Sequence, residues 1–66
     1  MPVMKVNVKK IKRLMRKEGL SVYELAVKSG MRERNMYRIF SDRTTRFTTL
    51  SRIAKAFGLD AKDLLE

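Results

Sequence analysis

Residues 20–40, LSVYELAVKSGMRERNMYRIF, decide the fold of this chain. The segment opens with a helix start, because Ser21 and Glu24 have the spacing of a capping box, in which each side chain accepts from the other residue's backbone N–H. Gly30 then ends this helix after about two turns, as a glycine just past the last helical residue does. A second helix is predicted over residues 32–40. The stretch therefore predicts two short helices joined by a tight turn.

The second of these helices has one apolar face. At 100° per residue, Met36, Ile39 and Phe40 point inward together. The side chains that then face outward are Arg34, Tyr37, Arg38 and Ser41. Two short helices around a glycine-containing turn form a helix-turn-helix, and an α-helix held by one face fits the major groove of B-DNA. The opening stretch therefore predicts a DNA-binding unit.

The residues on either side of this unit predict two longer amphipathic helices. Asn7 has the side chain of an N-cap for the first, which ends at Gly19, and the second runs from Phe47 or Thr48 to Gly58. Their apolar faces consist of Val8, Ile11, Leu14 and Met15 in the first and of Leu50, Ile53, Ala54 and Phe57 in the second. This spacing of three and four residues is typical of helices that pack on a core.

The remaining segments are shorter. Residues 41–46 are predicted to form a polar, basic loop, and Asp60 caps a short fifth helix. Residues 1–7 alternate loosely, which fits a short strand, an extended arm or a disordered tail. We therefore expect an all-α domain of five helices over residues 8–66, preceded by an N-terminal arm over residues 1–7.

Charge limits the range of partners. The chain has 66 residues with a formal net charge of +9, and residues 1–17 hold seven Lys and Arg residues and no acid. Such a basic excess in a small domain indicates a polyanionic partner, either nucleic acid or an anionic membrane surface. Cysteine and histidine are absent, which excludes disulfides and the usual zinc and iron sites. We expect neither a metal nor another cofactor.

The sequence lacks the residue patterns of an enzyme. It has no paired carboxylates, no nucleophile with a neighbouring base and no glycine-rich phosphate loop. No apolar run approaches the roughly 18 residues that span a membrane, and no apolar segment like that of a secretory signal follows Lys5. We therefore expect a cytoplasmic binding protein without catalytic residues.

Taken in order, these features resemble the helix-turn-helix domains of phage repressors and Cro proteins, an XRE-like family shared with many bacterial regulators. The resemblance rests on Ile11, Leu14, Gly19-Leu20-Ser21, Glu24-Leu25-Ala26, Gly30, Met36, Arg38-Ile39, Thr49-Leu50 and the run from Ile53 to Leu59. It implies a five-helix, lambda-repressor-like fold that binds operator DNA as a dimer. It also implies that the second helix of the motif enters the major groove.

The chain departs from the family pattern at three places. Val22 stands where members often have a phosphate-binding glutamine, so this contact is absent or falls to Tyr23. Ser29 stands where members have a leucine before the turn glycine. Met15 and Phe40 stand where many members pair an arginine with a glutamate, and replacing a buried ion pair by apolar contact can be neutral or stabilising.

The predicted recognition helix carries the candidate base contacts. They are Arg32, Glu33, Arg34, Tyr37 and Arg38. All but Tyr37 match positions from which members of the resembled family reach DNA. Arg34 and Arg38 come first, because arginine can donate two hydrogen bonds to guanine O6 and N7. The alternative for both is a solvated helix face.

Three neighbouring side chains have competing interpretations. Glu33 either accepts from a cytosine N4 amine or only complements the helix dipole. Tyr37 contacts a thymine methyl group or a phosphate, or merely covers Met36. Asn35 can read adenine in principle, but its position on the helical wheel turns it sideways, so we do not expect it to contact a base.

A second set of residues is predicted to contact phosphates, which hold the register of a protein on DNA without reading its sequence. The set consists of Tyr23, Lys28, Arg43, Thr44, Thr45 and Arg46. Some lysines of the first helix are expected to join it, although the alternative for that helix is an ordinary charged face.

The leading hypothesis is a sequence-specific regulator of the repressor or Cro type that binds a double-stranded operator as a homodimer. Such a dimer reads two half-sites about 34–36 Å apart. No small-molecule ligand is expected.

Three alternatives remain open. The same fold serves as the DNA-binding antitoxin or protein-interaction module of a toxin–antitoxin pair. Residues 5–17 alone form a basic amphipathic helix suited to an anionic membrane. RNA binding also fits the charge, although five aromatic residues do not form an evident stacking platform.

Overall fold

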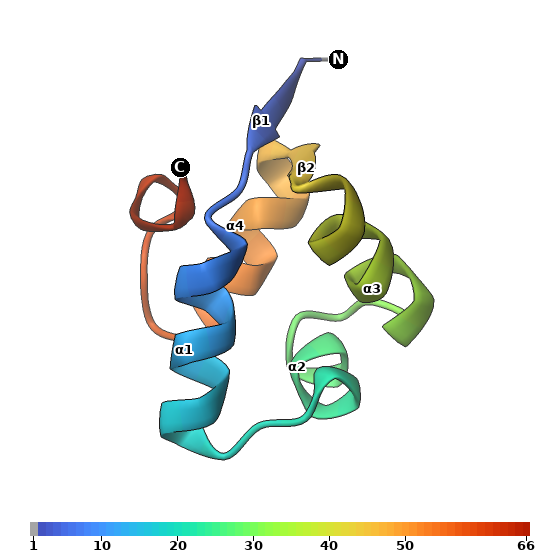
Figure 1. Cartoon of the computed structure of the whole chain (residues 1–66), viewed down its shortest axis with the longest axis vertical. Helices are drawn as coiled ribbons and strands as arrows, with labels where there is room; N and C mark the ends of the chain where they lie inside the picture. The colour runs from blue at the N-terminus through green and yellow to red at the C-terminus, as the bar shows by residue number, and fades with distance from the viewer. Residues whose placement is uncertain (1) are drawn as a thin grey trace.

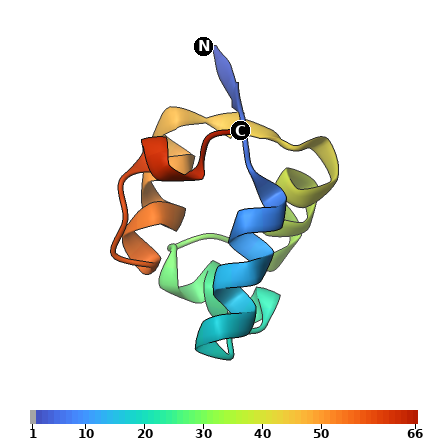
Figure 2. The ribbon, with the colours of Figure 1, turned by 60° about the vertical axis from the view of Figure 1, so that its left-hand side comes forward.

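The computed structural model describes residues 2–66 as a helical domain with a small two-stranded sheet attached (Figure 1). In chain order, its elements are β1 (Val3–Lys5), α1 (Val8–Glu18), α2 (Val22–Lys28), α3 (Glu33–Asp42), β2 (Thr44–Arg46), α4 (Phe47–Ala56) and the 3-10 helix η1 (Ala61–Leu64). Figures 1 and 2 show the four α-helices gathered around a common centre, with β1 extending beyond them and η1 on the opposite side from α3.

Local hydrogen bonds start the helices where the sequence predicts. Ser21 Oγ accepts from the backbone N–H of Glu24 at 3.1 Å, and the Glu24 carboxylate accepts from that of Ser21 at 2.9 Å, so the capping box is complete. Asn7 Oδ1 accepts from the N–H of Lys10 at 3.1 Å and caps α1. The bond from the Ser21 N–H is the main cause that holds the pKa of Glu24 below its ordinary value.

The turn between α2 and α3 depends on Gly30. Its φ of +68° lies in the left-handed region, which glycine enters without the steric cost that other residues meet. The N–H of Gly30 donates to the Val27 carbonyl at 3.1 Å, and the N–H of Met31 donates to the Ala26 carbonyl at 2.8 Å. These two bonds form a Schellman motif. Gly30 therefore separates two helices, as the sequence predicts.

The core lies where the helices meet, and all four contribute to it. Its fully buried large side chains are Val6, Ile11, Leu25, Met36, Leu50, Ile53 and Leu64. Because burying one such side chain stabilises a fold by about 1.5–3 kcal/mol, this cluster is the main support of a small domain. Ile11 and Met15 of α1 are both buried, so the apolar face of that basic helix is not available to a membrane surface.

The expectation of five α-helices is wrong. The last predicted helix is the single 3-10 turn η1, so the described residues contain four α-helices. The Asp63 carboxylate accepts from the N–H of Asp60 at 3.0 Å, which bends the chain at the predicted start. Only four residues follow in helical geometry, and a segment that short forms too few hydrogen bonds to stabilise an α-helix. Leu64 instead anchors the turn in the core.

The loop predicted over residues 41–46 is also wrong in part. Helix α3 continues to Asp42, and Arg43 closes it with a φ of 60°. The next three residues form β2, which pairs antiparallel with β1 in the register Val3↔Arg46, Met4↔Thr45 and Lys5↔Thr44. The N-terminal segment is thus a strand, one of the three possibilities that its sequence left open. Its partner lies about 40 residues away, so no local pattern predicts the pairing.

The C-terminal residues complete this end of the molecule. The N–H of Glu66 donates to the Lys5 carbonyl at 3.1 Å, and the N–H of Asn7 donates to the Leu64 carbonyl at 2.8 Å. Val6, within the predicted arm, is fully buried. The N-terminal segment is therefore held between β2 and the C-terminal residues.

Candidate nucleic-acid interface

Helix α3 is held by one face and presents the other. Met36 is 0% and Ile39 3% exposed, whereas Arg34 and Arg38 are both exposed. The helix begins directly after the Gly30 turn, with Arg32 in extended geometry at its N-cap. The predicted projection of the two arginines from the surface is therefore confirmed, and their contact with DNA stays a prediction.

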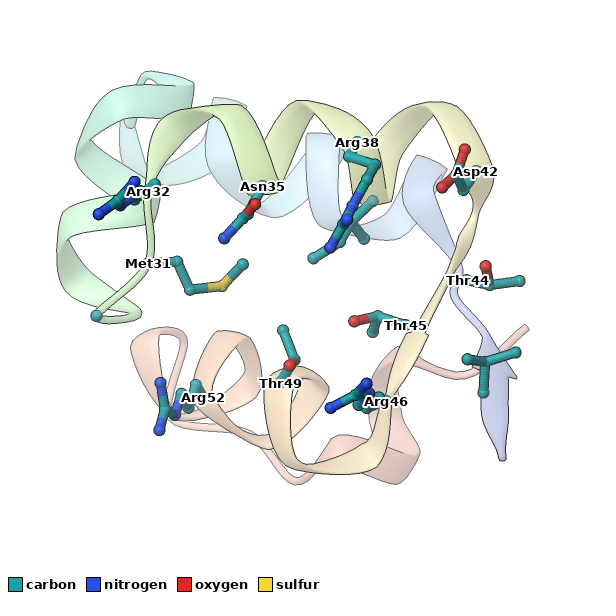
Figure 3. Close-up of a pocket in the computed structure, with 13 residues that line it drawn as sticks. Met31, Arg32, Asn35, Arg38, Asp42, Thr44, Thr45, Arg46, Thr49 and Arg52 are labelled. Carbon is teal, nitrogen blue, oxygen red and sulfur yellow. The ribbon is translucent and has the colours of Figure 1, made fainter. Parts of the chain in front are cut away.

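A groove runs along one side of α3, with β2 and α4 on its far wall (Figure 3). Its volume is about 610 Å³. The polar side chains that line it are Arg32, Asn35, Arg38 and Asp42 from the α3 wall, Thr44, Thr45 and Arg46 from β2, and Thr49 and Arg52 from α4. Two successive helices, which β2 connects, thus face each other across the groove.

The chemistry of this groove favours anions. Four arginines line it against one carboxylate, that of Asp42. Guanidinium groups donate paired hydrogen bonds to phosphate, and threonine hydroxyls and the asparagine amide add further donors. The Asp42 carboxylate lies at the β2 end of the groove in Figure 3, away from Arg32 and Arg52. The groove is therefore most cationic toward the start of α3.

The structure brings together some of the predicted site residues. Those that line the groove are Arg32, Arg38, Thr44, Thr45 and Arg46. They come from both predicted sets, the base contacts and the phosphate contacts. A single surface therefore collects side chains that the sequence assigned to two roles.

The other predicted residues lie elsewhere. Glu33 and Arg34 are exposed in the first turn of α3, outside the groove. On α2, Tyr23 is 61% exposed and Lys28 is also exposed. Arg43 does not line the groove with the β2 residues, because its left-handed backbone turns the chain there, and it lines a separate hollow beside the start of α1.

Tyr37 faces the side of α3 that is turned away from the groove. It is 54% exposed and lines a second hollow of about 400 Å³. The other residues of this hollow are Lys12, Met15, Arg16, Leu20, Val22 and Phe40. Met15 and Phe40, which replace an ion pair in the resembled family, thus line one surface between α1 and α3.

Sequence reasoning missed three side chains of the groove that can donate hydrogen bonds, which are Asn35, Thr49 and Arg52, and also the Asp42 carboxylate. The helical wheel places Asn35 on the flank of α3 rather than on its outward face, and the structure shows that this flank lines the groove. Thr49 and Arg52 are three residues apart and therefore share one side of α4. That spacing was a usable signal, but nothing local indicates that this side of α4 faces α3.

Other kinds of site find no support in residues 2–66. No cluster of three or more His, Cys, Asp or Glu side chains is placed to hold a metal ion. None of the helices described is both long and apolar enough to cross a bilayer.

Comparison with known families agrees with this geometry. The model of the Cro/C1-type HTH DNA-binding domain family matches residues 10–66. A search among curated proteins and a search among solved structures each returned no match. The matched segment contains all four α-helices except the first residues of α1, and it includes the Gly30 turn. The chain therefore belongs to the Cro/C1-type helix-turn-helix DNA-binding domain family.

Proposed function

We propose that this domain is a sequence-specific transcriptional regulator that inserts α3 into the major groove of an operator. The observation that carries the proposal is the placement of α3, which packs on the core through Met36 and Ile39 and exposes Arg34 and Arg38. A single α-helix has a diameter of about 10–12 Å and the major groove is about 12 Å wide, so a helix held in this way fits.

The residues divide into two roles in this proposal. Arg34 and Arg38 read base edges, because each can donate two hydrogen bonds to a guanine. We call Arg34 and Arg38 the base-reading ridge. Residues outside this ridge bind phosphates and fix the register of the protein on DNA. These are Tyr23, Lys28 and the β2 residues Thr44, Thr45 and Arg46. Glu33 and Tyr37 flank the ridge and contribute to sequence preference.

The regulator acts as a homodimer on DNA and represses by occupying the operator. Family members bind in this way, and a dimer of identical domains reads two inverted half-sites about 34–36 Å apart. The formal charge of +9 supports the proposal independently, because it draws the domain to a polyanion over a range beyond direct contact.

The test is selection of bound sequences from a library of random DNA duplexes. The expected result is an enriched motif with inverted symmetry, whose half-sites are spaced by one helical turn. Enrichment of one unrepeated half-site would remove the dimer from the proposal but leave the base reading. A pool that stays random, from a protein that binds duplexes, would contradict sequence-specific regulation altogether.

A further inference from the structure

The hollow between α1 and α3 has an apolar floor that is open to solvent. Four apolar side chains and the Tyr37 ring line it, and the four are Met15, Leu20, Val22 and Phe40. Leu20, Val22 and Phe40 are only half buried, and they pack on the core from outside. Contiguous apolar surface that polar residues border is typical of an interaction site.

Two basic side chains stand at the rim of this hollow. Lys12 and Arg16 line it from α1, and both are exposed. They are four residues apart and therefore share one face of that helix. None of the described residues that line the hollow is acidic. A molecule that enters the hollow therefore meets positive charge with no carboxylate beside it, so its own charge should be negative.

A second hollow continues this surface toward the start of α1. Its volume is about 470 Å³, and Lys12 and Phe40 line both hollows. Lys9 and Arg43 add two cations there, against one acidic residue, Glu66. Peptide recognition commonly uses adjoining pockets that each take a different side chain of the ligand. Two adjoining hollows therefore suit a polypeptide segment better than one small anion.

We propose that this surface between α1 and α3 docks an acidic segment of a partner protein. The segment buries an apolar anchor side chain against Met15 and Phe40, and it places carboxylates beside Lys12 and Arg16. A helix with acidic residues on one face and apolar anchors on the other has both properties. Docking of this segment is a function separate from the proposed DNA recognition, and neither depends on the other.

The apolar floor favours a protein segment over the backbone of a nucleic acid. A phosphodiester has no large apolar group to cover the floor, and moving a charged phosphate from water onto apolar surface costs free energy. The resemblance to the repressor and Cro family implies an ion pair at Met15 and Phe40 in many members, so the apolar floor is a departure from that pattern. Its chemistry therefore points to a partner that is not DNA.

The experiment measures the binding of three labelled synthetic peptides of equal length to the whole chain by fluorescence anisotropy. The first is an amphipathic helix with glutamates on one face and leucines on the other. The second replaces the leucines by alanines, so it keeps the charge without the anchors. The third replaces the glutamates by glutamines, so it keeps the anchors without the charge.

The expected result is that the first peptide binds at least about tenfold more tightly than the second, since burial of one leucine side chain accounts for a factor of that size. The first peptide should also bind more tightly than the third, and this second advantage should shrink as salt is added, because salt screens exposed charges.

Two variants with the same change of charge test the location. Lys12→Glu and Lys17→Glu both reverse an exposed charge on α1, but Lys17 lines neither hollow. Lys12→Glu is expected to weaken the first peptide at least about threefold more than Lys17→Glu does. Both sites are exposed, so neither change disturbs the core.

A double variant tests the apolar floor. Met15→Arg with Phe40→Glu gives the hollow the ion pair that the family resemblance implies. It is expected to keep the fold, which thermal unfolding checks, and to remove the advantage of the first peptide over the second. If this variant does not fold, the comparison of Lys12→Glu with Lys17→Glu still tests the inference.

Three results would overturn the inference. Equal binding of the first and second peptides, or no binding of either, shows that the hollow takes no apolar anchor. Equal losses in Lys12→Glu and Lys17→Glu place the peptide elsewhere on this basic domain. Duplex DNA is the competing occupant, and it is favoured if the peptides show no preference for leucine while Lys12→Glu lowers duplex affinity more than Lys17→Glu does.

Discussion

The Nζ atom of Lys12 lies 5.6 Å from the centre of the Phe40 ring, which joins α1 to α3 by a cation–π contact. The resemblance to the phage repressor and Cro family implies that many family members have an arginine and a glutamate at the positions of Met15 and Phe40. Here Met15 is 7% exposed and lines the same hollow as Phe40. Met15 and Phe40 therefore present apolar side chains to one shared hollow between the two helices, and the Lys12 ammonium lies over the Phe40 ring there.

This link predicts an energetic coupling between Lys12 and Phe40. Cation–π pairs at exposed sites contribute about 0.5–1 kcal/mol. A double-mutant cycle with Lys12→Met and Phe40→Leu, measured by urea denaturation, is expected to show a coupling of that size. The matched pair Lys17→Met with Phe40→Leu is the control and should be additive, because Lys17 does not line the hollow. Equal coupling in both cycles would contradict a specific Lys12–Phe40 contact.

The burial of the Ser29 hydroxyl predicts that replacing this residue by alanine stabilises the fold. Its side chain is 4% exposed, and its Oγ atom forms no hydrogen bond with any described residue. A buried hydroxyl without a partner costs about 1–3 kcal/mol, and an apolar group of similar shape avoids that cost. Ser29→Ala is therefore expected to raise the free energy of unfolding by about 1 kcal/mol. Ser41→Ala, at an exposed site, should stay within about 0.5 kcal/mol of the unaltered protein. A loss of stability in Ser29→Ala would show that its hydroxyl is satisfied in solution.

The ionisation of Glu24 is expected to cause part of the change in unfolding free energy with pH. Its pKa lies below its ordinary value, chiefly because the Ser21 N–H and hydroxyl bond its carboxylate. A lowered pKa in the folded state means that the unfolded chain takes up the proton more readily. The stabilisation is therefore complete above the ordinary glutamate pKa and is lost as the pH falls through the folded value.

The substitution Glu24→Gln isolates this contribution, because glutamine still accepts the hydrogen bond but does not titrate. Between pH 7 and pH 3, the gap in unfolding free energy between the unaltered protein and Glu24→Gln should shrink as the pH falls. Glu18→Gln is the control, since Glu18 is an exposed glutamate outside the capping box. A gap for Glu24→Gln that is constant with pH would mean that the capping box does not depend on the charge of the carboxylate.

Substitution of Arg34 tests whether the outward face of α3 reads bases. A bidentate contact from arginine to guanine discriminates against the wrong base by about 1–3 kcal/mol. Arg34→Ala is expected to lose affinity for the selected operator and to relax the preference at one base position in each half-site. Lys62→Ala removes the same charge far from α3 and should leave the preference intact. Unchanged affinity of Arg34→Ala for both selected and random duplexes would show that Arg34 does not read a base.

Much of the fold could be predicted from the sequence because it depends on contacts between near neighbours. The capping box of Ser21 and Glu24 and the Asn7 cap both join residues three apart. The left-handed turn at Gly30 is a property of one residue. The buried positions of α4, such as Leu50 and Ile53, follow from helical spacing alone. The exposure of the α3 arginines follows from the same spacing.

The tertiary structure alone decided the rest. The pairing of Val3 with Arg46, and the bond from Glu66 to Lys5, join residues that are distant in sequence. The groove likewise exists only because α3 and α4 pack so that Arg32 and Arg52 face each other. Helical periodicity states which side chains share a face of one helix, but not which face of another helix lies opposite. That arrangement is set by how the whole core packs, and no short stretch of sequence contains it.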